Sequence, residues 1–197
     1  MRLRQSEMAE RDHPREIEVK QRTIRSIGEL VGLEESVVAA AAAAAEGLFT
    51  QLQGAKDLSF LARIKFDACG FDPLDVTRSL NLIEQLNQSF TYLATIEGTR
   101  WLLERHPSHA PYQLNLGTAP GFDIISSDRA VVAETFAATH PDSNRKLQKD
   151  VEKLRGADAK HKYVFYLSRS QAVKQYDDVT VVRLDHASLT NKQRADA

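Results

Sequence analysis

The sequence predicts a mixed α/β domain preceded by an all-helical N-terminal region. Up to about Gly70 the apolar residues recur at helical spacing. After Pro107 they gather instead in short runs separated by Gly, Pro, Ser or Asp, which is typical of strands. A chain of 197 residues, 42% of them hydrophobic, is long enough for one substantial core with a helical extension.

The N-terminal region is expected to form three helices. Pro14 suits the first turn of a helix that Gly32 can end, with apolar positions at Ile17, Ile24, Ile27 and Leu30 or Val31. Ser36 begins a second helix that runs through an alanine tract, residues 39–45, whose small side chains favour a close helix–helix contact. A third, short helix covers about residues 58–68. The segment IRSIGELVGLEESVV also resembles half of a helix-turn-helix, although a plain helical hairpin is favoured.

The rest of the chain is expected to contain a long helix followed by strands and one more helix. The long helix begins at Leu74 or Leu80, ends at Arg105 before Pro107, and buries a stripe made of Leu86, Phe90, Leu93 and Trp101. Three strands are expected in YQLNLG, GFDIIS and AVVAETFAAT, a helix capped by Asp142 or Ser143 in SNRKLQKDVEKL, and two final, central strands in KYVFYLS and VTVVRLD.

These elements divide the chain into a helical region for DNA binding or dimerisation (1–72), a mixed domain (73–190) and a polar tail (191–197). The formal net charge of -1 gives no global sign of a nucleic-acid partner, so a basic surface must be local. The single cysteine, Cys69, excludes an internal disulfide and fits a reducing cytoplasm. No apolar stretch is long enough to cross a membrane. We therefore expect a cytoplasmic protein.

Two acids in PGFDIISSDRAVVAE stand on consecutive expected strands: Asp123 on the first and Glu134 on the second. Carboxylates on adjacent antiparallel strands can share a divalent cation. Glu134 lies in a strongly apolar strand, on the same face as Val132 and Phe136. A carboxylate in that position is costly unless it is paired, hydrogen-bonded or bound to a metal. A structural ion pair with Lys146 or Arg145 would also satisfy Glu134, and Asp123 alone would be read as the end of a strand.

The order helix, three strands, helix, two strands, with Asp123 and Glu134 on the second and third strands, resembles the PD-(D/E)XK nuclease superfamily and its restriction-endonuclease-like core. The resemblance covers residues 80–185. It implies that Asp123 and Glu134 bind Mg²⁺ and that a nearby lysine assists the hydrolysis of phosphodiester bonds in double-stranded DNA. Within the superfamily the chain looks most like a type II restriction endonuclease, which implies a homodimer.

The superfamily places its lysine two residues after the glutamate, and here that position is Phe136. In some of its families the basic residue is carried by the following helix. Lys146 is then the first candidate and Lys149 the second, whereas Lys153 is expected to be too far along the helix. The alternative is a catalytically inactive nuclease fold that binds DNA or a protein partner.

Other residues receive lesser roles. Glu97 is either an outer metal ligand lent by the long helix or a partly exposed glutamate at the edge of its stripe. Basic residues outnumber acids between residues 142 and 174, and the DNA-binding candidates are Arg145, Lys149, Lys153 and Arg169. The remaining candidates for metal binding, His106, His109, His140 and His161, are expected to be scattered surface residues with no metal-ligand spacing.

Overall fold

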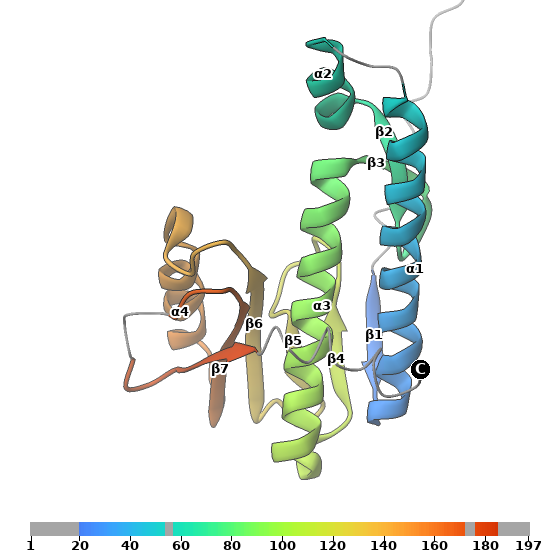
Figure 1. Ribbon diagram of the computed structural model, residues 1–197. Coiled ribbons are helices and arrows are strands. Elements are labelled where there is room, and N and C mark those ends of the chain that lie inside the picture. The colour runs from blue at the N-terminus through green and yellow to red at the C-terminus, as the bar shows by residue number, and fades with distance from the viewer. Residues whose placement is uncertain (1–19, 54–56, 172–175, 185–197) are drawn as a thin grey trace, which may run out of the picture.

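The structure is a computed structural model that describes residues 20–53, 57–171 and 176–184. Its elements, which Figure 1 shows, are β1 (Gln21–Ile24), α1 (Ile27–Leu52), α2 (Ser59–Phe66), β2 (Ala68–Asp72), β3 (Asp75–Asn81), α3 (Leu82–Arg105), η1 (Pro107–His109), β4 (Tyr112–Asn115), β5 (Ile124–Ser126), β6 (Val131–Ala137), η2 (Ser143–Arg145), α4 (Lys146–Arg155), β7 (His161–Leu167) and β8 (Thr180–Leu184). The predicted mixed α/β class is confirmed.

The main sheet has six strands in the order β1-β4-β5-β6-β7-β8, and β2 and β3 form a separate hairpin. Neighbours from β1 to β6 are antiparallel, whereas β6, β7 and β8 are parallel. The parallel pair β6–β7 needs a crossover, which α4 provides. From α3 onward the elements follow the expected order of helix, three strands, helix and two strands. The expectation that both final strands are central is wrong for β8, which lies at the sheet edge.

Helices cover both faces of the sheet, and a separate hydrophobic core lies on each face (Figure 1). α3 packs over Ala133 and Phe165, with α1 alongside it. Gly98 permits this close packing, because an added Cβ would lie 2.9 Å from the Phe165 ring. α4 packs on the opposite face, where Leu147, Val151 and Leu154 meet Val132, Phe136, Val164 and Tyr166.

The N-terminal region is not all-helical, which corrects the prediction. Residues 21–24 form β1, whose Ile24 is buried opposite Tyr112 of β4. The two helices expected around Gly32 and Ser36 are one helix, α1. Its buried residues Leu30, Val37 and Ala44 recur every two turns and continue through Gly32, so burial overrides the stop signal. The part of the first expected helix before residue 20 and the tail lie outside the described residues.

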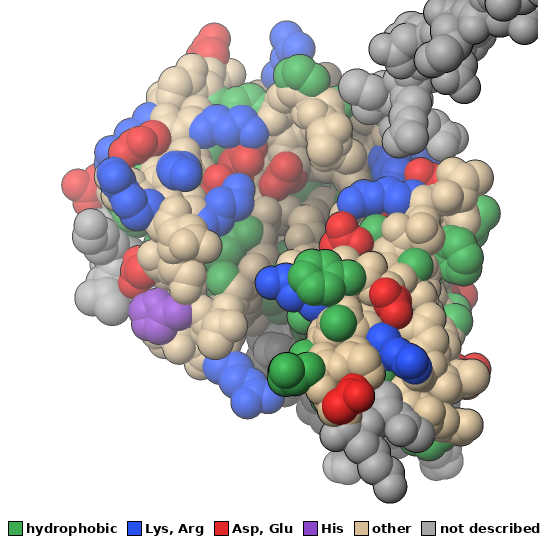
Figure 2. All heavy atoms as spheres, turned by 90° about the horizontal axis from the view of Figure 1, so that it is seen from above, with side chains coloured by type: hydrophobic (Ala, Val, Ile, Leu, Met, Phe, Trp, Pro, Cys, Tyr) green, Lys and Arg blue, Asp and Glu red, His purple; other side chains and the backbone are tan. Residues whose placement is uncertain are grey.

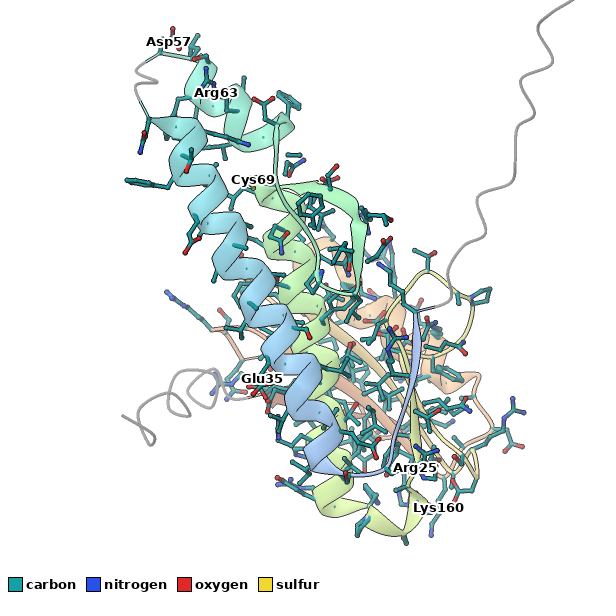
Figure 3. All side chains as sticks on the ribbon, turned by 90° about the vertical axis from the view of Figure 1, so that its right-hand side faces the viewer. Arg25, Glu35, Asp57, Arg63, Cys69 and Lys160 are labelled. Atoms are coloured by element: carbon teal, nitrogen blue, oxygen red, sulfur yellow. The ribbon has the colours of Figure 1, made fainter. Side chains whose placement is uncertain are left out.

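The alanine tract makes the close contact that was predicted, with the β2–β3 hairpin as well as α3. A Cβ added to Gly70 of β2 would lie 2.5 Å from that of Ala44, so only glycine allows this approach. The boundary expected after residue 72 falls in the turn of this hairpin. The third expected helix is confirmed as α2, where Arg63 donates to the Gln51 carbonyl at the end of α1, 2.6 Å away (Figure 3).

α3 begins at Leu82, later than expected, because Leu80 belongs to β3. Asn81 caps the helix by accepting a hydrogen bond from the Glu84 amide at 2.9 Å, and the Glu84 side chain accepts one from the Asn81 amide at 3.1 Å. Leu86 is 44% exposed and does not belong to the buried stripe. Within the described ranges, no helix is both long and apolar enough to cross a membrane.

Candidate active site

Asp123 directly precedes β5 and is anchored to β6. Its Oδ2 accepts hydrogen bonds from the Thr135 amide at 2.7 Å and from the Thr135 hydroxyl at 3.2 Å. The same hydroxyl lies 2.7 Å from the Thr95 hydroxyl of α3. Because Thr135 follows Glu134 in β6, these bonds hold the Asp123 carboxylate next to Glu134. The structure thus brings the two predicted acids together.

Glu134 is 3% exposed and faces α4 from the middle of β6. The Lys153 ammonium lies 2.6 Å from Glu134 Oε1 and forms an ion pair with it. Burial, followed by the negative charge of Asp123, raises the pKa of Glu134 to about 7, although Lys153 opposes this rise. The site therefore holds a carboxyl group near its titration point at neutral pH.

A third acid, Asp150 of α4, is buried like Glu134 and interacts electrostatically with both Glu134 and the partly buried Asp123; we call these three residues the acid cluster. Its Oδ1 accepts a hydrogen bond from the Lys146 ammonium at 2.7 Å, while its Oδ2 has no hydrogen-bond partner among the described residues. Burial raises the pKa of Asp150. The sequence analysis missed this residue as a site candidate. The signal for it was the spacing of Lys146, Asp150 and Lys153, which places them on one helix face.

The two lysines approach the acid cluster from different turns of α4. Burial lowers the pKa of Lys146, but Asp150, Asp123 and Glu134 together raise it above its usual value, so the ammonium stays charged. The expectation that Lys153 lies too far along α4 is wrong. Lys146 and Lys153 are two turns, about 10 Å, apart along the axis. Lys146 contacts Asp150, and Lys153 contacts Glu134. Lys149 lies between them and is exposed.

Phe136, which stands where the resemblance would place a lysine, belongs to the hydrophobic core. It is 4% exposed, stacks on Tyr166 with ring centroids 5.7 Å apart, and belongs to the same core as Leu147 of α4. An ammonium at this position would have to enter a dry core. The strand therefore supplies no lysine, and the cations of the site come from α4.

Glu97 belongs to a helix–helix contact instead of the acid cluster. Its Oε1 accepts a hydrogen bond from Arg100 Nε at 3.2 Å, and Arg100 Nη2 lies 2.6 Å from Glu34 of α1. Glu97 is two residues beyond Thr95, which touches β6, and two residues turn a helix by about 200°. Glu97 consequently faces away from the sheet, and its expected role as a metal ligand is not supported.

The surface beside Asp123 is hollowed, and both basic and acidic residues line the hollow. A cavity of about 900 Å³ is lined by Asp123 together with Lys20, Arg78, Thr91, Tyr92 and Asn115. Figure 2 shows a hollow between the part of the molecule that contains α4, where Lys and Arg side chains gather, and the part that contains α1 and α2. All four DNA-binding candidates, Arg145, Lys149, Lys153 and Arg169, are exposed.

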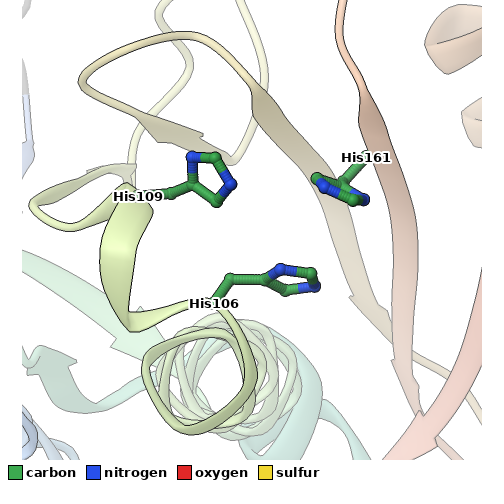
Figure 4. A group of neighbouring side chains, drawn as sticks. All are labelled: His106, His109 and His161. Carbon is green, nitrogen blue, oxygen red and sulfur yellow. The ribbon is translucent and has the colours of Figure 1, made fainter.

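Three histidines converge near the C-terminal end of α3, contrary to the expectation that they are scattered. One ring nitrogen each from His106, His109 and His161 lies within 4.8 Å of the others (Figure 4). His140 is a separate, exposed residue. The spacing of three between His106 and His109 was a readable signal, whereas the contribution of His161 depends on the tertiary fold.

No family model, curated protein or solved structure matches this chain. The chemistry of the acid cluster must therefore be argued from its own geometry and charges.

Proposed function

We propose that this chain is a metal-dependent endonuclease that hydrolyses phosphodiester bonds in double-stranded DNA, most specifically a type II restriction endonuclease with a PD-(D/E)XK core. The observation that carries the proposal is Glu134, a carboxylate buried in the sheet with its pKa raised to about 7 and flanked by Asp123 and Asp150. Burying such groups together costs stability, and strongly perturbed carboxyl groups concentrate at functional sites.

The order of elements supports the same assignment. α3 precedes an antiparallel meander, β4–β5–β6, and α4 then crosses to β7, which is parallel to β6. Asp123 stands at the start of the second strand of the meander and Glu134 lies in the third. This is the placement that the superfamily motif requires of its two acids.

The donor set fits Mg²⁺. Three carboxylates face two ammonium groups, which leaves an excess of negative charge, and Asp150 Oδ2 is a buried acceptor without a hydrogen bond among the described residues. Mg²⁺ prefers carboxylate and water oxygens. Asp123 and Glu134 would hold the ion, which supplies a more acidic bound water and neutralises charge on the phosphate.

The two lysines suit different tasks. Lys153 pairs directly with Glu134 and compensates its charge as long as no metal does so. Lys146 is 44% exposed at its side chain, remains charged and senses both Asp123 and Glu134. The Lys153 side chain is almost as exposed, at 43%, but it is already paired with Glu134. We therefore assign to Lys146 the contact with the phosphate, where a fixed cation stabilises the charge that develops in the transition state. Arg145, Lys149 and Arg169 would contact the DNA backbone, and cutting both strands of a palindrome would need a homodimer.

A catalytically inactive nuclease fold is the second candidate, and two observations favour it. Phe136 removes the strand lysine, and Lys153 already satisfies part of the charge on Glu134. Such a protein would bind DNA or a protein partner through the same basic surface without cutting.

The test is to incubate the purified protein with long genomic DNA, which contains most short recognition sites, in the presence of Mg²⁺ or EDTA. Discrete fragments that need Mg²⁺ would support a sequence-specific endonuclease, and smearing would support a non-specific one. Retarded but intact DNA would favour the second candidate. If the DNA is neither cut nor retarded, a DNA-directed function is contradicted. The Glu134→Gln variant is the control for a contaminating nuclease.

A further inference from the structure

The three histidines come from separate elements that meet at one end of the molecule. His106 caps the C-terminus of α3, His109 ends η1, and His161 begins β7. The ring centroids of His106 and His161 are 4.6 Å apart, those of His109 and His161 are 5.7 Å apart, and those of His106 and His109 are 6.0 Å apart. All three side chains are partly buried, so the cluster is open to water on one side.

The ring of His109 is oriented by a carboxylate. His109 Nδ1 lies 2.6 Å from Asp128 Oδ2, and the other oxygen, Asp128 Oδ1, accepts bonds from the Ser126 hydroxyl at 2.6 Å and the Ala130 amide at 3.0 Å. Because the carboxylate can only accept, Nδ1 carries the proton and the lone pair of Nε2 is left for another partner. Figure 4 shows the His109 ring turned toward the other two. A carboxylate behind a histidine in this manner is the usual support of a metal ligand.

Hydrogen bonds also fix the position of His106. Its Nε2 lies 2.6 Å from the Tyr163 hydroxyl, and its backbone carbonyl accepts a bond from the Tyr112 hydroxyl at 2.8 Å. With Nε2 engaged, Nδ1 is the nitrogen left for the cluster. Burial, followed by the proximity of His161, lowers the pKa of His106 and so favours the neutral form of the ring. Neutral imidazoles can bind a metal.

We propose that His106, His109 and His161 form a binding site for one divalent transition-metal ion of the Zn²⁺ class, with the fourth position open to water. Imidazole nitrogens suit Zn²⁺ and similar ions, whereas Mg²⁺ prefers oxygen. A tetrahedral Zn²⁺ with Zn–N bonds of 2.0–2.1 Å requires nitrogens roughly 3.3 Å apart. The nitrogens now lie within 4.8 Å of one another, so the rings must close by up to about 1.5 Å.

Charged residues near the site affect its affinity for a metal ion. Arg105 and Lys160 lie close enough to His106 to repel a cation, while Asp128 behind His109 attracts one. The alternative is a stack of aromatic rings, since Trp101 and Tyr163 also pack on His106. That alternative predicts no affinity for metals. A bound ion would join the end of α3 to the start of β7 and would therefore stabilise the folded chain against heat.

Zn²⁺ binding to the full chain can be measured by calorimetry, in the presence of excess Mg²⁺ so that the acid cluster does not compete. His109→Asn keeps a group that can donate to Asp128 but removes Nε2, and His161→Ala removes a second ligand. Each substitution should lower the Zn²⁺ affinity by on the order of a hundredfold or more, and Asp128→Asn by about tenfold to a hundredfold. The His140→Ala control should bind as the wild type does.

The thermal unfolding temperature gives a second readout that detects misfolded variants. Zn²⁺ should raise it in the wild type and in His140→Ala, but not in His109→Asn or His161→Ala, whose unfolding temperatures without metal should stay near that of the wild type. Co²⁺ should give the intense visible absorption of a four-coordinate ion only when the three histidines are present. Unchanged Zn²⁺ affinity in His109→Asn and His161→Ala, or no stoichiometric binding to the wild type, would overturn the proposal.

Discussion

Glu134 of the acid cluster and His161 of the histidine cluster lie on opposite faces of the same pair of strands, β6 and β7. Glu134 shares the α4 face with Val164, its neighbour in register, whereas His161 is on the α3 face with Tyr163. One cluster offers oxygen ligands and the other nitrogen ligands. The acid cluster also contains its own cations, Lys146 and Lys153, so a metal must displace the Lys153 contact with Glu134. The sheet thus builds two sites of different preference from the two sides of one scaffold.

Removing either predicted metal-binding acid should have the largest effect on DNA cleavage. Asp123→Asn and Glu134→Gln should slow Mg²⁺-dependent cleavage by at least on the order of a thousandfold, because metal stabilisation of the transition state is worth several kcal/mol. DNA binding should persist, since negative charge near the phosphate is removed. Glu152→Gln, which neutralises an exposed acid of α4, is the matched control and should cleave normally. Full activity in Glu134→Gln would mean that Glu134 is a structural acid.

Substitutions of the lysines of α4 should affect DNA cleavage and DNA binding differently. Lys146→Ala should slow single-turnover cleavage by on the order of a hundredfold, because a fixed cation is lost from a partly dehydrated site. The exposed Lys149→Ala variant should only weaken DNA binding and reduce its salt dependence by about one ion. A collapse of cleavage in Lys153→Ala with little effect in Lys146→Ala would transfer the catalytic role to Lys153.

The acid cluster should also make the stability of the protein depend on pH, even without metal or DNA. A raised folded-state pKa means that the folded protein binds more protons than the unfolded chain between pH 4.5, the ordinary value for glutamate, and about 7. The contribution of Glu134 to the free energy of unfolding should therefore fall as the pH rises through this range, by on the order of 1–3 kcal/mol. The lowered pKa values of His106 and His161 contribute in the opposite direction, so the comparison with Glu134→Gln isolates the effect. Urea unfolding in EDTA at pH 5 and pH 8 measures the difference. Glu134→Gln should flatten it, and a variant as pH-sensitive as the wild type would refute this account.

The smallest expected effect is that of the histidines on cleavage. Since Glu134 and His161 lie on opposite faces of the sheet, His109→Asn should cut DNA at a rate within about twofold of the wild type, as expected of distant sites. The measurement is single-turnover cleavage with Mg²⁺ and no added transition metal. A large loss would show that the two clusters act on one another.

The sequence predicted the second half of the fold better than the first. From Pro107 onward, short apolar runs between breakers left little ambiguity. Near the N-terminus, Ile24 fits both a helical and a strand pattern, and only pairing with β4 decides between them. Gly32 looked like a helix end, but the burial of Leu30 and Val37 on either side keeps the helix intact.

Sequence patterns likewise identified only part of the two clusters, because tertiary packing decides the rest. Alternation along β6 was enough to select Glu134, because its apolar neighbours made a buried acid conspicuous. Asp150 and Lys153 looked like ordinary solvated charges of a helix, and which of them turns inward depends on how α4 packs. His161 is distant in sequence from His106 and His109, so only the fold brings the three together.

The most direct test of the central claim is Mn²⁺ binding followed by electron paramagnetic resonance, which needs no knowledge of a DNA recognition sequence. Mn²⁺ shares the preference of Mg²⁺ for carboxylate and water oxygens. At pH 8, where Glu134 is largely ionised, the wild type and His109→Asn should each bind Mn²⁺ with the same saturation curve, and Asp123→Asn and Glu134→Gln should lose that binding. Equal Mn²⁺ binding by Glu134→Gln and the wild type would contradict the assignment of a metal site to the acid cluster.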